Sequence, residues 1–455
     1  MASLPAAPLP NIVLILADNL GWGELGCYGG GVLRGAPTLR IDRLASEGLR
    51  LLNFNVESDC VPTRSALMTG RHPIRTGGVQ AGAPLGIIPW EVTLAQLLSS
   101  RGYATGIFGK WHLGDRPGRY PNDRGFDEWY GIPRTSTESM FPSSRGYEEK
   151  FAPFPYVMEG RKGEVAKNVA TYDLDMRRRI DSDLVARTND FISRQAKARR
   201  RFFAYVPITQ LHLPTIPHLD FAGSTGNGDF ADSLFEMDHR VGEVLDNIDR
   251  LGIAEDTLFI FASDNGPEFR RPWRGTAGPW VGTYHTAMEG GLRAPCIVRW
   301  PGKVPPGGAS NEIVHVTDLY VTLARAAGAA IPTDRPIDGV DQLGFLLGQQ
   351  DRSNREGFVF CIMDEIRAVK WRNWKLHVVW EVEPNDGPKH LESPLLFNLI
   401  WDPKEQTDVD IHNAWVRIYM QRMIREFRES LKAHSPIPFD APDDFVPGKP
   451  GRDPG

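Results

Sequence analysis

Short, continuous apolar runs rich in β-branched residues alternate with longer stretches of helical periodicity over the first two thirds of the chain. Apolar runs of this length are typical of strands buried on both faces of a parallel sheet. The predicted strands are residues 11–17, 103–108, 202–206 and 258–262, and the predicted helices are residues 37–47, 93–101, 181–196 and 232–251. Strands that alternate with helices form parallel sheets covered on both faces. The sequence therefore predicts an α/β fold with a large, mainly parallel mixed sheet flanked by helices.

The pattern changes in the last quarter of the chain. Short apolar segments at 357–363, 368–371, 374–380 and 395–399 predict an antiparallel sheet, and residues 413–433 have helical periodicity. We therefore expect a large domain of residues 1–350 and a smaller antiparallel α+β subdomain of residues 351–455. The tail from residue 435 to residue 455 is dense in Pro, Gly and Asp, which predicts an extended or poorly ordered segment.

Residues 134–172 lack a clear period and are rich in Ser, Pro, Gly and charge. A stretch of this length predicts a long insertion over the sheet, which would be either a lid on the substrate side or a surface loop.

Composition excludes several classes of protein. Lys and Arg total 52 against 57 for Asp and Glu, a net charge of -5, so we expect no nucleic acid as a partner. No run approaches the ~20 apolar residues of a membrane span. The first apolar run, residues 12–17, is too short for a signal peptide, and 4 cysteines make no disulfide framework. These observations predict a soluble, cytoplasmic protein without a membrane partner.

Polar side chains follow each of the four predicted strands. They are Asp18 and Asn19, Lys110 and His112, His212, and Asp264 and Asn265. Taken singly, each has an ordinary explanation as a helix cap, a turn or a structural histidine. Together they belong to the carboxyl edge of one parallel sheet, where such folds bind ligands.

Two carboxylates and two amides in this set supply only oxygen. Asp18, Asn19, Asp264 and Asn265 thus form the ligand set of a hard cation, Ca²⁺ or Mg²⁺, rather than zinc. They leave room for one further oxygen donor and for substrate. We predict one divalent cation, with Ca²⁺ favoured over Mg²⁺.

The segment from Cys60 to Arg71 reads CVPTRSALMTGR. Pro62 favours the start of a helix, so Cys60 would lie at a helix N-terminus, where the dipole and free N–H groups favour negative charge. Arg64, about one turn into the helix, would reach the same anion. The residues predict an anion site with an activated Cys60. The alternative, a buried cysteine before an ordinary helix, leaves Pro62 and Arg64 unexplained.

This Cys-x-Pro-x-Arg segment, followed by Thr-Gly-Arg, resembles the signature of the sulfatase family within the alkaline-phosphatase-like superfamily. Residues 11–29, 109–114 and 263–266 resemble further family motifs, as do His212 and residues 395–403. The resemblance therefore covers nearly the whole chain, and it is strongest to bacterial arylsulfatases.

The resemblance implies hydrolysis of small-molecule sulfate esters through formylglycine. A formylglycine-generating enzyme would oxidise Cys60 to the aldehyde, and one hydroxyl of its hydrate would attack sulfur in line. His212 matches the acid that protonates the leaving alcohol. His112 matches the base that removes a proton from the second hydroxyl, so that sulfate leaves and the aldehyde is restored.

The resemblance also implies roles for the charged residues. Lys110 would contact the sulfate oxygens, and Arg64 would hold the formylglycine oxygens and nearby carboxylates. Residue 60 would join the two carboxylates and two amides as a metal ligand.

Two positions depart from the family pattern. The family usually has Asp where this chain has Asn19, which removes one negative charge from the cation site. The family also usually has Lys shortly before Glu-Gly-Gly, whereas Tyr284 and His285 stand in that stretch here. We consider Tyr284 and His285 as substitute contacts to substrate.

Two other functions remain open on the sequence. One is hydrolysis of phosphonate or phosphate esters by an enzyme of the same superfamily. The other is a non-catalytic sulfatase fold that binds sulfated ligands, which the two departures suggest. The sequence does not identify the alcohol part of the substrate or the oligomeric state.

Overall fold

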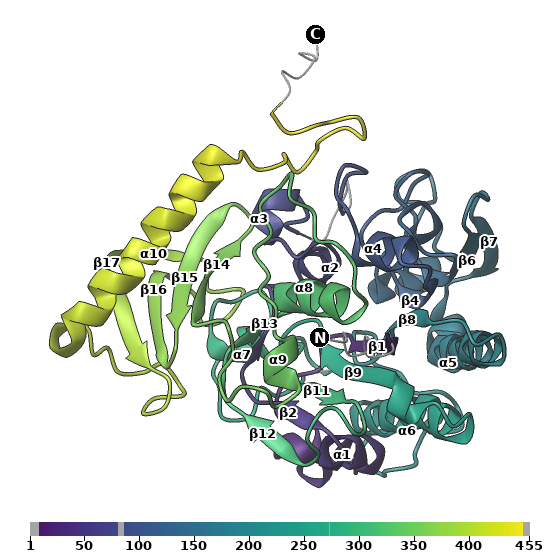
Figure 1. Ribbon diagram of the computed structural model, residues 1–455. Coiled ribbons are helices and arrows are strands. Elements are labelled where there is room, and N and C mark those ends of the chain that lie inside the picture. The colour runs from purple at the N-terminus through teal and green to yellow at the C-terminus, as the bar shows by residue number, and fades with distance from the viewer. Residues whose placement is uncertain (1–8, 81–85, 273, 449–455) are drawn as a thin grey trace.

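The computed structural model describes residues 9–80, 86–272 and 274–448, and a ten-stranded sheet runs through its centre (Figure 1). Its strand order is β12-β2-β11-β9-β1-β8-β4-β5-β6-β7. In chain order these strands are β1 (Asn11–Ala17), β2 (Leu49–Leu51), β4 (Ala104–Lys110), β5 (Glu128–Ile132), β6 (Tyr156–Arg161), β7 (Lys167–Thr171), β8 (Phe202–Pro207), β9 (Thr257–Ser263), β11 (Cys296–Arg299) and β12 (Gly308–Ser310).

The centre of the sheet is parallel. β9, β1, β8, β4 and β5 run in one direction, and β11 and β6 pair antiparallel on either side of them. The predicted large, mainly parallel mixed sheet is therefore confirmed. In the register, Ala17 of β1 lies opposite Ser263 of β9, so the polar residues that follow these two strands begin side by side.

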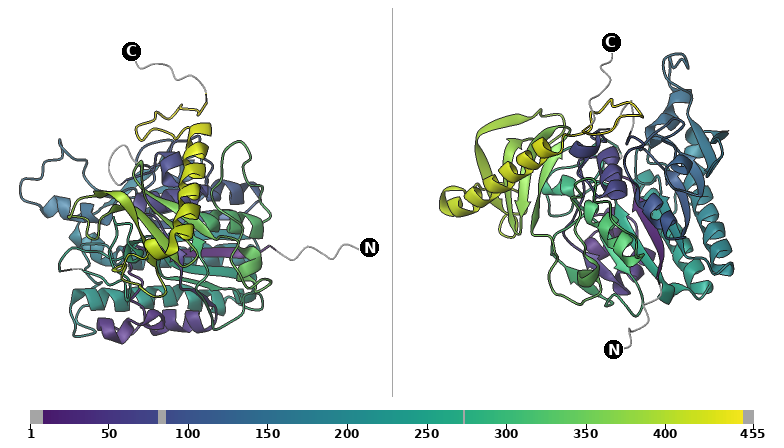
Figure 2. Two further views of the ribbon diagram at one scale, coloured as in Figure 1. Left: turned by 90° about the vertical axis from the view of Figure 1, so that its left-hand side faces the viewer. Right: turned by 45° about the horizontal axis from the view of Figure 1, so that its top comes forward.

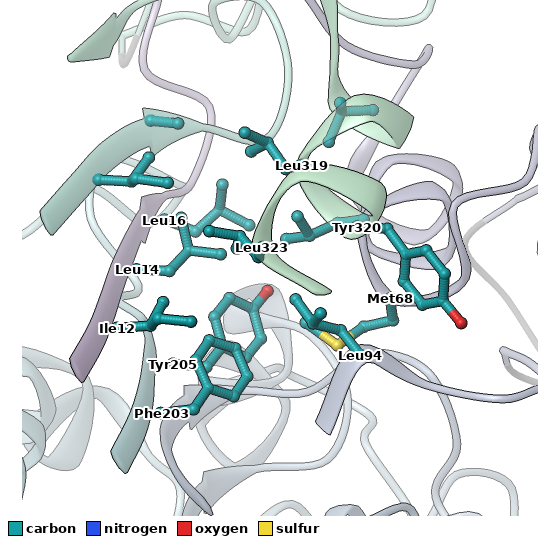
Figure 3. Close-up of a cluster of buried hydrophobic side chains, with 14 of the residues drawn as sticks. Ile12, Leu14, Leu16, Met68, Leu94, Phe203, Tyr205, Leu319, Tyr320 and Leu323 are labelled. Atoms are coloured by element: carbon teal, nitrogen blue, oxygen red, sulfur yellow. The ribbon is translucent and has the colours of Figure 1, made fainter. Parts of the chain in front are cut away.

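Side chains of β1 point alternately to two apolar layers. Ile12, Leu14 and Leu16 pack on the face that also holds residues of α2, α4 and α8 (Figure 3). Val13 and Ile15 pack on the opposite face with α1, α5 and α6. The helices are α1 (Leu39–Ser46), α2 (Cys60–Thr69), α4 (Leu94–Ser100), α5 (Leu174–Lys197), α6 (Asp229–Arg250) and α8 (Val316–Ala326). Burial of both faces explains why the central strands are continuously apolar.

Helix α5 begins seven residues before the predicted start at residue 181. Asp173 caps it, because its side chain accepts a hydrogen bond from the Met176 N–H at 2.9 Å. The first turns are dominated by charged residues, so they carry little apolar periodicity from which a sequence-based boundary could be drawn.

The insertion at residues 134–172 is more ordered than its sequence predicts. It contains the 3₁₀-helix η4 (Ser136–Ser143) and the strands β6 and β7, which extend the edge of the main sheet. The expectation of a plain loop is therefore wrong for these segments, whereas a lid on the substrate side stays a prediction. β7 is almost entirely exposed, and an edge strand without a buried face lacks the alternation that reveals strands in a sequence.

The C-terminal subdomain has the predicted antiparallel sheet. Its strands, in order, are β14 (Gly357–Ile362), β15 (Glu365–Trp371), β16 (Trp374–Trp380) and β17 (Lys389–Asn398), and α10 (Ala414–Ala433) packs against them (Figure 2). A short sheet of β3 (Phe54–Asn55), β10 (Arg293–Ala294) and β13 (Val314–His315) was not predicted, and α3 (Pro73–Thr76), α7 (Glu289–Leu292) and α9 (Leu343–Leu346) are single turns.

The tail after α10 packs on the large domain. Ile437 and Ala441 are buried and share a small apolar cluster with Ile88. The expectation of an extended tail for residues 449–455 lies outside the described residues. Among the residues that are described, no helix combines the length and hydropathy needed to cross a membrane.

Candidate active site

Three parallel strands from the centre of the sheet bring charged side chains to one of its edges. Asp18 follows β1, Asp264 follows β9, and Lys110 ends β4. All three are fully buried, and the Lys110 Nζ donates a hydrogen bond to Asp18 Oδ2 at 2.7 Å. The structure thus brings together residues that the strand-end argument expected to meet.

Arg64 enters the same cluster from α2. Its Nη2 donates to Asp264 Oδ2 at 2.7 Å and lies 3.5 Å from Asp18 Oδ2. Its Nη1 donates to the main-chain oxygen of Lys110 at 2.7 Å. Two buried cations therefore face two buried carboxylates, an arrangement that compensates the cost of removing these charges from water.

The cluster retains oxygen atoms that fit a cation. Asp18 Oδ1 and Asn265 Oδ1 are buried and accept no hydrogen bond from any residue that the structure describes. Buried oxygens without a partner call for an explanation such as a bound ion. Asn19 lies beside them, with its Oδ1 accepting from Asn265 Nδ2 at 2.6 Å. The donor set therefore fits one hard divalent cation.

The two carboxylates differ in their protonation behaviour. Burial alone would raise the pKa of Asp18, but the charges of Lys110, His212 and Arg64 outweigh it and lower that pKa. Burial and the neighbouring Asp18 raise the pKa of Asp264 to about 6. A bound cation would favour the charged form of both.

Cys60 is the first residue of α2, as its sequence context predicts. Asp59 caps the helix by accepting from the Val61 N–H at 3.1 Å. The Cys60 Sγ, an Asp18 carboxylate oxygen and a His212 ring nitrogen all lie within 4.8 Å of one another.

The expected activation of the Cys60 thiol is wrong. Burial raises its pKa, Asp18 and Asp264 add to the effect, and Lys110 opposes it only in part. A helix N-terminus favours a thiolate, but desolvation and carboxylates outweigh that preference here. The unmodified cysteine is therefore a poor nucleophile.

The two site histidines are buried and neutral. Burial lowers the pKa of His212 to about 4, and burial and Lys110 hold the pKa of His112 well below its usual range. The His212 Nδ1 is 2.7 Å from the Leu213 carbonyl, which can only accept, so this nitrogen carries the proton. His112 Nδ1 is buried without a hydrogen-bond partner among the described residues.

Tyr284 and His285 lie beside the start of α2. The His285 N–H donates to the Ser58 oxygen at 2.7 Å, and its Nδ1 is 3.3 Å from Asp59 Oδ2. The His285 side chain is 39% exposed, whereas Tyr284 is buried against it with ring centroids 4.4 Å apart. Of this pair, His285 is therefore the one positioned to meet an incoming ligand.

Sequence reasoning missed three residues that support the site. Glu268 accepts from Asn19 Nδ2 at 2.8 Å, and Thr135 Oγ1 lies 3.3 Å from His212 Nε2. Arg177, buried on α5, donates to the main-chain oxygen of His212 at 2.9 Å and so fixes that loop. Glu268 could have been suspected from the sequence, because it lies in the same loop as Asp264. Thr135 and Arg177 are distant in sequence from every motif and could not.

Comparisons with known proteins identify the family to which the chain belongs. The sulfatase family model matches residues 10–329. The chain is 33% identical over 484 residues to N-acetylgalactosamine-6-sulfatase of Canis lupus familiaris, covering 97% of this chain and 87% of that protein. It is 36% identical over 443 residues to arylsulfatase A of Homo sapiens, covering 89% and 84%.

The comparison with solved structures also finds a sulfatase. The PsFucS1 sulfatase from Pseudoalteromonas sp. matches with a TM-score of 0.87 and 30% identity, covering 93% of this chain and 91% of that one. A phosphonate monoester hydrolase of Agrobacterium radiobacter shares the fold, with a TM-score of 0.62 and 18% identity over 93% of this chain and 96% of that one. The fold and its strand-end cluster define an alkaline-phosphatase-like hydrolase. The chain belongs to the sulfatase family and is a sulfuric ester hydrolase.

Proposed function

We propose that this protein hydrolyses small-molecule sulfate esters through formylglycine at position 60, with one divalent cation, preferentially Ca²⁺. The observation that carries the proposal is the placement of Cys60. It lies at a helix N-terminus beside Asp18 and His212, yet its own thiol is held protonated. A buried cysteine of raised pKa is a poor nucleophile, so the proposal assigns the attack to the formylglycine that is made from it.

The chain's own residues supply binding and proton transfer. Formylglycine, once hydrated, would supply the attacking oxygen, and a cation held by Asp18, Asn19, Asp264 and Asn265 would lower the pKa of such an oxygen. Lys110 and Arg64 place positive charge where sulfate oxygens would lie. His112, neutral in the free protein, suits the base that accepts a proton from position 60.

His212 requires a further condition to act as the acid. Its pKa of about 4 leaves Nε2 without a proton in the free protein. A sulfate ester brings negative charge into the site, and a nearby negative charge favours the protonated imidazole. Substrate binding would therefore load the proton that Nε2 then gives to the leaving alcohol.

Removing the cation should lower kcat by about 10²-fold or more, because a Lewis acid contributes several kcal/mol to such reactions. We would dialyse the mature protein against a chelator, measure metal content and assay an aryl sulfate. Ca²⁺ should restore more activity than Mg²⁺ at equal concentration. Full activity in a sample with no bound metal would contradict the proposal.

His285 should replace the lysine contact to sulfate. We expect His285→Ala to raise KM about tenfold or more, since hydrogen bonds to charged groups contribute ~1.5–3 kcal/mol, and His285→Lys to recover most of the loss. Initial rates over a range of concentrations of one aryl sulfate give the KM of each variant. His239→Ala, which changes a 45%-exposed side chain on α6, is the control. An unchanged KM in His285→Ala would remove this residue from the site.

A matched pair of substrates separates the proposal from hydrolysis of phosphonates. An aryl sulfate and an aryl phosphonate with the same leaving group should differ in kcat/KM in favour of the sulfate. A higher kcat/KM for the phosphonate would instead favour that activity, and no turnover of either ester by fully aldehyde-bearing protein would favour a binding role.

A further inference from the structure

Asn19 is held by hydrogen bonds at both ends of its amide. Its Nδ2 donates to Glu268 Oε2 at 2.8 Å, and its Oδ1 accepts from Asn265 Nδ2 at 2.6 Å. The residue is 2% exposed and has φ of 58°, a left-handed conformation that Asn adopts more readily than most residues. The amide therefore has one defined orientation beside the oxygens that fit a cation.

Glu268 is an unusual partner for this amide. It is 1% exposed, and its Oε1 has no partner of full hydrogen-bond geometry among the described residues. Burial raises the pKa of this carboxylate, and the nearby Tyr284 hydroxyl opposes the rise. The nearest cation is Arg270, whose Nε is 4.0 Å from Oε1 and whose side chain is 59% exposed. A buried carboxylate with one unpartnered oxygen is costly unless something compensates its charge.

A carboxylate also selects one orientation of an amide. An ionised carboxylate can only accept hydrogen bonds, so the NH₂ end of Asn19 must face Glu268 and the oxygen end must face away from it. That oxygen end lies against Asn265, whose own Oδ1 is among the unpartnered oxygens. Glu268 thus directs the Asn19 oxygen to the side of Asn265, whose Nδ2 donates to it at 2.6 Å and whose own oxygen belongs to the candidate cation site.

We propose that Glu268 is a positioning residue for the cation, which turns the Asn19 oxygen towards it and supplies the negative charge that Asn19 lacks. The inference rests on the proposed cation-dependent function. Outer residues that orient ligands in this way commonly change metal affinity by about 10–100-fold when they are replaced.

The test is calorimetric titration of Ca²⁺ into the full-length, metal-free protein. We expect Glu268→Ala to raise Kd about 10–100-fold, because both the orientation and the charge are lost. Glu268→Gln should have an intermediate effect, since its side-chain oxygen still accepts from Asn19 but carries no charge. Glu91→Gln, which alters another buried glutamate, paired with Arg71 and outside the cluster, should bind Ca²⁺ as the wild type does.

A double variant that exchanges the charges of positions 19 and 268 tests the proposal further. In Asn19→Asp/Glu268→Gln the negative charge moves to position 19 and the amide to position 268. We expect Kd to return to within a few-fold of the wild-type value. Asn19→Asp alone would place two carboxylates at a contact that is now 2.8 Å long, so it should unfold at a lower temperature than the double variant in the absence of Ca²⁺.

The outcomes separate the two proposals. Wild-type affinity in both Glu268→Ala and Glu268→Gln, with the wild type binding Ca²⁺, would overturn the role of Glu268 alone. A wild-type protein that binds no divalent cation would overturn the cation-dependent function and this inference with it. If Glu268→Ala does not fold, Glu268→Gln and the double variant decide the question.

Discussion

Replacing Cys60 by Ala should reduce sulfatase activity by at least about 10⁴-fold, because loss of a covalent nucleophile has effects of this size or larger. The protein should be produced with its formylglycine-generating enzyme, so that the wild type contains the aldehyde. Mass spectrometry of the peptide that contains position 60 gives the aldehyde fraction, and initial rates on an aryl sulfate give activity. Wild-type activity should rise in proportion to that fraction.

Two matched variants show that the effect belongs to position 60. Cys296→Ala alters another fully buried cysteine, on β11, and should retain the activity of a folded protein. Cys60→Ser should accept sulfate once and then stall, because it has no second hydroxyl to drive elimination. Full turnover by Cys60→Ala would contradict the mechanism and place the nucleophile elsewhere.

Replacing Glu289 by Gln should lower the free energy of unfolding by about 3–5 kcal/mol, the range for removing one partner of a buried ion pair. Lys370 Nζ donates to Glu289 Oε2 at 2.7 Å, and Lys375 Nζ lies 3.1 Å from Oε1. Both lysines come from the C-terminal sheet and are almost fully buried. Urea titration followed by tryptophan fluorescence measures the change.

An exposed ion pair next to the strand ends of the same sheet provides the control. Glu356 pairs with Arg372, and both side chains are more than half exposed, so Glu356→Gln should cost at most about 1 kcal/mol. Equal unfolding midpoints for Glu289→Gln and Glu356→Gln would contradict a structural role for the buried network.

The pH dependence of this effect has a defined sign. Burial would raise the pKa of Glu289, but Lys370, Lys375 and Arg293 hold it well below the model-compound value of 4.5. The stabilisation by Glu289 is therefore present above pH 4.5 and is lost as the pH falls through the lower, folded-state pKa. The difference between wild type and Glu289→Gln should shrink on acidification below pH 4.5.

This network also connects the two parts of the chain at the active site. Glu289 begins α7 directly after the segment that carries Tyr284 and His285, and its N–H donates to Glu405 Oε1 at 2.8 Å. The C-terminal sheet therefore fixes a segment that lines the site.

The fold follows closely from the local sequence. The predicted bounds of β1 agree with the structure, and the four strand ends meet because parallel strands place their carboxyl ends at one edge of a sheet. Edge strands such as β7 cannot be predicted in this way, because an exposed strand lacks the alternation of apolar and polar residues that indicates a strand in the sequence. The predicted boundary between residues 350 and 351 stays a prediction.

The sequence by itself indicated the candidate reacting and metal-binding groups of this site, because each of those groups follows a strand, begins a helix or belongs to a local motif. It did not indicate the supporting residues Glu268, Thr135 and Arg177. Only the tertiary structure decided how those groups behave. The raised pKa of Cys60 depends on burial among carboxylates from separate strands, and the contact between Asn19 and Glu268 joins positions 249 residues apart. Desolvation and long-range contacts arise from the packing of distant segments, so they cannot be predicted from a local pattern of residues.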